Sequence, residues 1–294
     1  MSAIAVLLAL LCVLCYTGQN FFNKLFSITY NGPPASATPV FACVYGLITG
    51  FVTLAYSGFQ FRPSAVTLAL GVVNGVILFL FNLSAINASR TGPYAFQSIM
   101  MLFGNILLPL FFTVLVWGDR LNGIRIAGIL VMLGSFVLFN GKGLNFAGVR
   151  KGYFLWVFLL FLTNGLYGIV LDAQQRLMLQ TQRNEMIVAT FAVSAIISAV
   201  YLLILQGRDS AAAFRMGGKT WAFVLGSSIC AAAAVNTLML TMTYVPVSVL
   251  YTISNGGVLI ANAVLGAAVL KEKLNGFMIA GIGLAVFSLI LLSV

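Results

Sequence analysis

Long apolar runs follow one another along the whole chain, and short polar segments separate them. An α-helix needs roughly 20 apolar residues to cross the hydrocarbon core of a bilayer. The pattern therefore predicts an all-α integral membrane protein. Ten transmembrane helices are expected, at residues 3–24, 38–57, 65–88, 93–117, 121–140, 152–175, 185–205, 219–242, 246–270 and 274–294. The connections are mostly tight, so consecutive helices are expected to be antiparallel neighbours.

The later part of the chain repeats a stretch from its middle at a constant offset of 153 residues, from 93–139 to 246–292. Leu121-Asn122-Gly123 matches Leu274-Asn275-Gly276, and the Ile-Ala-Gly-Ile sequence that begins at Ile126 recurs at Ile279. Asp119-Arg120 matches Glu272-Lys273, so the order of charges is also kept. Self-similarity of this kind predicts a chain built from two related units.

The offset assigns five of the predicted helices to each half. We expect a first five-helix unit at 1–140, a connecting loop at 141–151 and a second five-helix unit at 152–294. Because five is odd, the second unit must enter the membrane in the opposite orientation. Two inverted repeats are typical of secondary transporters, whose halves move around a shared site.

Composition supports a membrane protein, with 61% hydrophobic residues, 7% charged residues and a mean hydropathy of +1.08. The net charge of +10 comes from basic residues scattered singly between the apolar runs, which is typical of loops beside membrane helices and not of a nucleic-acid surface. The N-terminus is apolar from Ala3 and lacks a basic segment, so we interpret it as a first span and not as a cleaved signal peptide.

Enzyme signatures are missing from the sequence. The chain has no histidine and no phosphate-binding GxxxxGK[ST] motif, which excludes His-dependent zinc and triad chemistry and one common route of ATP hydrolysis. Cys12, Cys15, Cys43 and Cys230 lie in apolar runs without metal-ligand spacing and are interpreted as packing residues. We therefore expect a protein that is not an enzyme and that uses no cofactor or metal.

Only five acidic residues are present. Four of them look like loop or helix-end residues, whereas Asp172 lies within the predicted span 152–175, near its end. Arg176 lies four residues later on the same helix face. Asp172 is a candidate for coupling transport to protons, because an ionisable group in a span is a functional candidate. The alternative is an ion pair that anchors the helix end. Facilitated transport or exchange is an open alternative to proton coupling.

Neutral polar residues gather on the first, third and fourth predicted spans and on their repeat partners, the sixth, eighth and ninth. Amides that faced lipid would be costly, so a shared central pocket is expected. The alternative for any single amide is a bond to a neighbouring helix. The preferred substrate-binding residues are Tyr16, Asn20, Asn82, Tyr94, Gln97, Tyr167, Asn236, Tyr251 and Asn255.

Small residues predict close helix packing. Gly46 with Gly50, and Gly71 with Gly75, form GxxxG patterns, which indicate helix contact without naming the partner. Pro109 lies inside the fourth predicted span and should kink it, either as a hinge or as simple shaping of the helix.

The chain resembles the drug/metabolite transporter superfamily, in particular its EamA-like members. The resemblance rests on the ten-helix pattern, on the acid, turn and Leu-Asn-Gly sequences at Asp119 and Glu272, on Gly128 and Gly281, and on Pro93 and Pro246. It implies a carrier for small metabolites with both termini in the cytoplasm. The basic residues favour the reverse, since the loops on the side of the N-terminus hold five and the opposite loops hold ten.

We expect a secondary transporter that moves a neutral or zwitterionic metabolite, such as an amino acid, by alternating access. No lysine or arginine lies clearly inside a span, which argues against a strongly anionic substrate. A lipid flippase or scramblase and a non-transporting membrane scaffold are the alternatives. The expected partners are a small-molecule substrate and the lipid bilayer, with a monomer or weak homodimer in a bacterial inner or plasma membrane. Import and export, including amino acid export, stay open.

Overall fold

The protein is described by a computed structural model that covers residues 3–33, 35–92, 94–120, 122–140, 149, 151–178, 181–207, 210–268 and 275–293. Within these ranges all regular structure is helical and no strand is present. The predicted connecting loop 141–151 lies largely outside the described residues.

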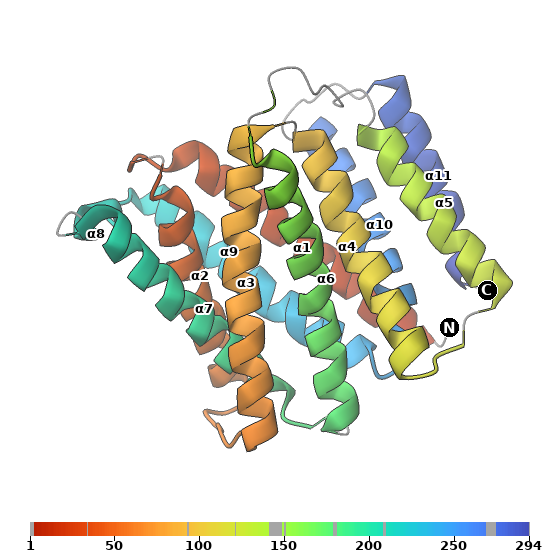
Figure 1. Ribbon diagram of the computed structural model, residues 1–294, viewed down its shortest axis with the longest axis horizontal. Helices are drawn as coiled ribbons and strands as arrows, with labels where there is room; N and C mark the ends of the chain where they lie inside the picture. Colours follow the sequence, from red (N-terminus) through yellow and green to blue (C-terminus); the bar gives the residue numbers. More distant parts are fainter. Residues whose placement is uncertain are drawn as a thin grey trace.

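The helices follow the predicted segments closely. They are α1 (Ala3–Thr29), α2 (Ala37–Tyr56), α3 (Ala65–Thr91), α4 (Tyr94–Val116), α5 (Gly123–Asn140), α6 (Tyr153–Leu177), α7 (Arg183–Gln206), α8 (Ser210–Ala213), α9 (Gly218–Thr241), α10 (Val247–Ala268) and α11 (Gly276–Ser293) (Figure 1). The short α8 was not predicted, and α1 continues beyond its predicted end to Thr29.

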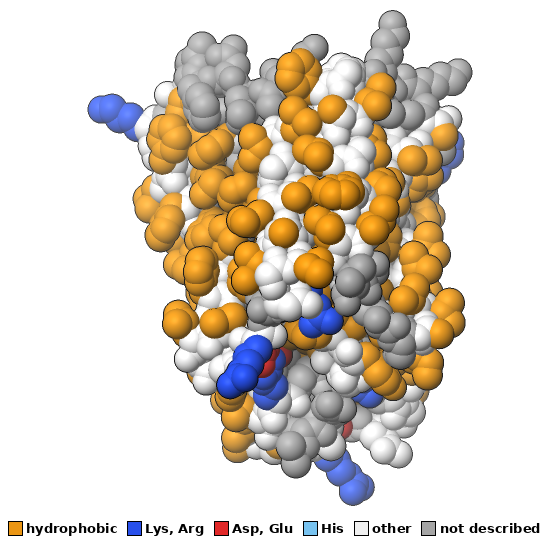
Figure 2. All heavy atoms as spheres, turned by 90° about the vertical axis from the view of Figure 1, so that its right-hand side faces the viewer, with side chains coloured by type: hydrophobic (Ala, Val, Ile, Leu, Met, Phe, Trp, Pro, Cys, Tyr) orange, Lys and Arg blue, Asp and Glu red, His pale blue; other side chains and the backbone are white. Residues whose placement is uncertain are grey.

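Eight of the described helices, α1 to α7 and α9, are long and apolar enough to cross a membrane, and α10 and α11 contain shorter apolar segments. Large apolar side chains point outward, including Leu115 at 80% exposed and Ile204 at 76%. Figure 2 shows apolar side chains spread over the middle of one face, with Lys and Arg toward its ends. The chain is therefore a multi-pass membrane protein.

Most helices pack against helices from the other half of the chain. Helix α1 packs chiefly on α9, α2 on α7, α5 on α11, and α6 on both α3 and α4. Consecutive helices do touch, as for α4 with α5 and α10 with α11, but these contacts are smaller than those between the halves. A short connection makes two helices consecutive in the chain but does not give them complementary surfaces. Glycine-rich faces instead meet across the two halves.

The two GxxxG patterns meet the same partner, α7. A Cβ atom at Gly46 of α2 would lie 2.8 Å from the carbonyl oxygen of Phe191, and one at Gly75 of α3 would lie 2.7 Å from that of Thr190. Such distances leave no room for a side chain. The predicted close contacts are confirmed, and α2 and α3 both pack tightly against α7.

Helices α5 and α11 lie side by side at one lateral edge of the bundle (Figure 1) and share a reciprocal pair of hydrogen bonds. The Ser135 hydroxyl donates to the carbonyl of Gly281 at 2.8 Å, and the Ser288 hydroxyl donates to that of Gly128 at 2.6 Å. Both the two serines and the two glycines are separated by the repeat offset of 153 residues. The part of the repeat in which the two stretches match best thus forms two helices that bind each other symmetrically.

Asn122 and Asn275 each stand just before the start of a helix, α5 and α11 respectively. The side-chain oxygen of Asn122 accepts from the backbone N–H of Arg125 at 2.8 Å, and that of Asn275 accepts from Met278 at 3.1 Å. A side-chain oxygen in this position satisfies a backbone donor that has no partner inside the helix. The repeated asparagines therefore define where α5 and α11 begin.

Candidate functional site

A cavity of about 860 Å³ lies in the middle of the bundle and is lined by helices α1, α2, α3, α4, α6, α7, α9 and α10. It reaches the surface at the C-terminal part of α1, where Lys24 and Ser27 are exposed. This is the end of the bundle at which α1 finishes, opposite to the end at which it begins. The cavity is therefore accessible from one end of the bundle.

Six of the nine predicted binding residues line this cavity. They come from four helices that the repeat and the polar pattern had marked, α1, α3, α6 and α10, and are Tyr16, Asn20, Asn82, Tyr167, Tyr251 and Asn255. The sequence argument for a shared polar pocket thus led to residues that are brought together in space.

Two predicted residues do not reach the cavity. Gln97 is 3% exposed, and its amide donates to the carbonyl of Ala85 on α3 at 3.0 Å. The amide of Asn236 donates to the carbonyl of Ala232 in its own helix at 2.8 Å. Gln97 therefore bonds to a neighbouring helix, which is the alternative that the sequence left open. Asn236 bonds chiefly within its own helix and makes a longer contact of 3.4 Å with the Thr53 hydroxyl of α2. The side chain of Tyr94 lies outside the described residues.

Several cavity residues were not selected from the sequence, among them Gln19, Tyr45, Asn105, Asn164 and Asn262. For α1 the signal was present, since Tyr16, Gln19, Asn20, Asn23 and Ser27 recur every three or four residues and so share one helix face. No comparable signal marked Tyr45, which enters from α2 and accepts a 2.9 Å hydrogen bond from the Gln19 amide.

Four buried polar atoms at the cavity have no hydrogen-bond partner within the described protein. They are Oε1 of Gln19, Oδ1 of Asn105, Nδ2 of Asn255 and Oη of Tyr251. A buried polar atom without a partner costs about 1–3 kcal/mol, so such atoms gain from a ligand that completes their bonds. The amide oxygens can only accept and the Asn255 amide nitrogen can only donate. The cavity therefore offers both kinds of polar contact.

Charge is nearly absent from the cavity wall. Among the described lining residues, Lys24 at the mouth is the sole charged side chain, and no carboxylate is present. Rings of Tyr16, Tyr45 and Tyr167 provide flat surfaces beside the amides. The arrangement suits a ligand that combines polar groups with an apolar or flat part and carries little net charge.

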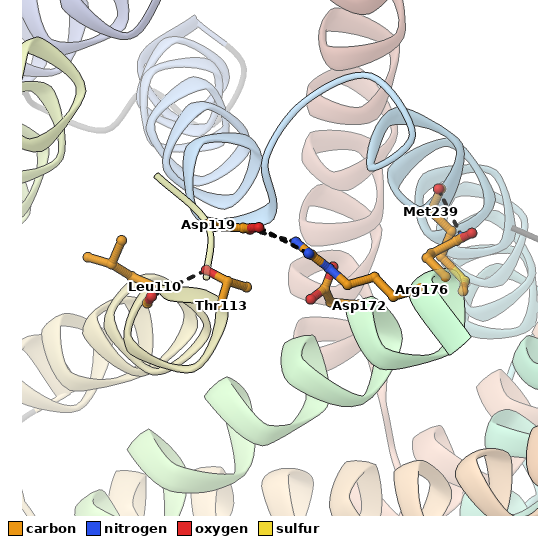
Figure 3. A network of polar contacts seen from close by, with 7 residues as sticks. Leu110, Thr113, Asp119, Asp172, Arg176 and Met239 are labelled. Carbon is orange, nitrogen blue, oxygen red and sulfur yellow. Dashed lines mark hydrogen bonds and ion pairs between the residues drawn. The ribbon is translucent and has the colours of Figure 1, made fainter. Parts of the chain in front are cut away.

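Asp172, the predicted coupling residue, lies outside this cavity, near the C-terminal end of α6. Its side chain is 3% exposed and accepts a 3.0 Å hydrogen bond from Nε of Arg176. The predicted pairing four residues apart is therefore confirmed. Figure 3 shows the Arg176 guanidinium held between Asp172 and Asp119. Two further hydrogen bonds, of 3.0 and 2.6 Å, join Arg176 to both carboxylate oxygens of Asp119.

An apolar layer separates the central cavity from this ion-pair network. Leu171, Met239, Val247 and Leu250 are at most 1% exposed and belong to one core cluster together with the cavity residue Tyr251. Beyond this layer lies a second hollow of about 880 Å³, lined by Asp119, Asp172, Arg176 and the turn between α9 and α10. The two hollows share no described lining residue, so the cavity is closed at the end where the ion pairs lie.

No family model and no curated protein matches the chain. A solved structure, described only as "Crystal structure of protein", is similar over 99% of this chain and 96% of its own length. The TM-score is 0.77 at 17% sequence identity. At this identity the likeness shows that the two chains share a fold.

Proposed function

We propose that the protein is a secondary membrane transporter for a small neutral or zwitterionic metabolite. The observation that carries the proposal is the central cavity of about 860 Å³, which is accessible from one end, closed at the other and furnished with unpartnered polar atoms. A cavity of this kind inside a membrane bundle supports binding of a solute that is released when the closed end opens.

Alternating access of two inverted five-helix halves is the mechanism that we propose, with ten spans that include α10 and α11. The support is the exchange of roles between halves. Helix α1 packs on α9, and its partner by the repeat, α6, packs on α3, which is the repeat partner of α9. The bonds of Ser135 to Gly281 and of Ser288 to Gly128 are related in the same way, because replacing each residue by its repeat partner converts one bond into the other. The resemblance to EamA-like carriers agrees with this mechanism.

An amino acid with an apolar or aromatic side chain is the substrate class that we favour. Amide oxygens of Gln19 and Asn105 can accept from an ammonium group, whereas the Asn255 amide and the Tyr251 hydroxyl can donate to a carboxylate. The tyrosine rings can pack against the side chain. We place the protein in a bacterial inner or plasma membrane with cytoplasmic termini, as the family resemblance implies.

Transport into proteoliposomes tests the proposal. Purified protein should accelerate the uptake or counterflow of at least one labelled amino acid relative to empty vesicles. Asn255→Ala should reduce this rate at least tenfold, because it removes a donor at the cavity. Asn140→Ala is the matched control, since Asn140 lies at the end of α5 and does not line the cavity.

Failure of every neutral and zwitterionic solute in the panel would refute the proposal. Scrambling of a fluorescent lipid in the same vesicles would instead favour the lipid flippase or scramblase alternative. Absence of both activities would favour a membrane scaffold.

A further inference from the structure

The ion pairs of Arg176 join two segments that are far apart in sequence. Its bond to Asp172 stays within α6, whereas its two bonds to Asp119 cross to the turn between α4 and α5 (Figure 3). The guanidinium also lies 5.4 Å from the ring centre of Trp117 in the same turn. The end of α6 is therefore fastened to the α4–α5 turn by one side chain.

A second fastening holds the same end of α6 to α9. The amide of Gln175, beside Arg176, donates to the carbonyl of Met239 at 2.9 Å. Arg176 and Gln175 thus tie the end of α6 to its neighbours on two sides. All of these contacts lie around the hollow that forms the outer part of the closed end.

The geometry of the charged contact suits a bond that must hold and also release. Two parallel hydrogen bonds between a guanidinium and a carboxylate are strong and directional. The side chains of Arg176 and Asp119 are nevertheless 31% and 23% exposed, so water can replace the contact when the segments separate. A fully buried pair would oppose separation far more strongly.

Opening of the closed end requires movement across this contact. The apolar layer of Leu171, Met239 and Val247 is contributed by α6, α9 and α10, and both Val247 and Arg176 line the second hollow. The end of α6 cannot move away from the α4–α5 turn while both bonds to Asp119 are in place. Release of Arg176 from Asp119 therefore precedes or accompanies opening.

We infer that Arg176 and Asp119 form an ionic latch that keeps this end of the transporter closed and sets which conformation the empty protein prefers. This inference rests on the proposed function. Asp172 acts as a positioning residue, because its bond to Nε orients the guanidinium so that both terminal nitrogens face Asp119. Gln175 holds the backbone from which Arg176 extends.

Cysteine accessibility in detergent, where a water-soluble maleimide reaches both ends, tests the latch without any substrate. The natural cysteines are replaced first. One reporter is Val247→Cys, at a position that is 1% exposed in the closed layer. The other is Ser27→Cys, at an exposed position beside the cavity mouth.

Arg176→Gln and Asp119→Asn should each raise the labelling rate at position 247 about tenfold, which corresponds to a shift of about 1.4 kcal/mol between the two conformations. The rate at position 27 should fall in the same variants, because the open end closes as the closed end opens. Arg176→Lys should restore part of the original pattern, since it keeps the charge but loses the paired geometry.

Arg120→Gln is the matched control. It removes the same charge beside the same hollow, from a side chain that makes no ion pair within the described residues. Unchanged rates in the Arg176 and Asp119 variants would overturn the latch, and so would a rise at both reporters, which marks general loosening of the fold. If the reporters respond as expected but no solute is transported, the proposed function fails and the latch stands.

Discussion

The crossing of α4 and α6 depends on two glycines, and Gly104→Ala should disrupt it. A Cβ atom at Gly104 would lie 2.1 Å from the carbonyl oxygen of Phe161, and one at Gly165 would lie 2.5 Å from that of Gly104. Real Cβ contacts rarely fall below 3.0 Å, so the substitution requires the helices to separate by ~0.9 Å. Both obstacles are backbone atoms, which cannot rotate away.

The cost follows from that displacement. Overpacking of a tight interface destabilises a protein by about 1–3 kcal/mol, and a backbone obstacle places this case at the upper end. Alanine recovers about 1 kcal/mol through its better helix propensity. The net loss should be about 2 kcal/mol, which corresponds to a fall of roughly 5 °C in the melting temperature of the purified protein.

The crossing also positions the cavity wall. The Asn164 amide on α6 donates to the carbonyl of Met101 on α4 at 2.7 Å, and both residues line the cavity. Gly104→Ala should therefore lower ligand affinity as well as stability. Thermal unfolding of the purified protein, with and without ligand, measures both effects.

Gly134→Ala in α5 is the matched control, because a Cβ atom there would meet nothing within 4 Å. This variant should be as stable as the original protein or slightly more stable. The reasoning is refuted if Gly104→Ala melts at the same temperature as Gly134→Ala, since that result would show that α4 and α6 do not approach as closely as the structure states.

Three further predictions concern the site and the repeat. Gly168→Ala would place a Cβ atom 2.8 Å from the ring of Tyr251, so it should raise the KM for transport several-fold with a smaller change in protein yield; an unchanged KM would separate Tyr251 from binding. Asn275→Ala removes the cap that accepts from Met278 and should cost about 1 kcal/mol, seen as a melting temperature a few degrees lower than that of the original protein. Asp172→Asn should slow uptake driven by a proton gradient and solute exchange to the same extent, because Asp172 orients the Arg176 guanidinium, whereas loss of the proton-driven mode alone would assign this carboxylate a coupling role.

The sequence by itself determined where the helices lie and where two of them begin. Apolar runs of about 20 residues are local properties of the chain, and the bilayer requirement converts them directly into helices. The caps at Asn122 and Asn275 are equally local, because each oxygen accepts from a backbone group three residues away. The GxxxG patterns correctly indicated tight contacts, although they named no partner.

The tertiary structure alone decided which amides face the cavity. Asn236 and Asn255 both lie on apolar helices and look alike in sequence, yet Asn236 bonds to its own helix and Asn255 presents a free amide nitrogen at the cavity. The difference is the rotation of each helix about its own axis, which is set by packing against the neighbouring helices. That rotation cannot be predicted from the types and spacing of the residues alone.

Pairing between distant segments belongs to the same class of information. The sequence identified the contact of Asp172 with Arg176, because four residues along a helix fix their separation. It did not identify the bond of Arg176 to Asp119, which is 57 residues away. That contact exists because α6 packs on α4 and brings the end of one helix to the turn after the other. Local sequence determined the positions of the helices, and packing between the halves determined the cavity and its closed end.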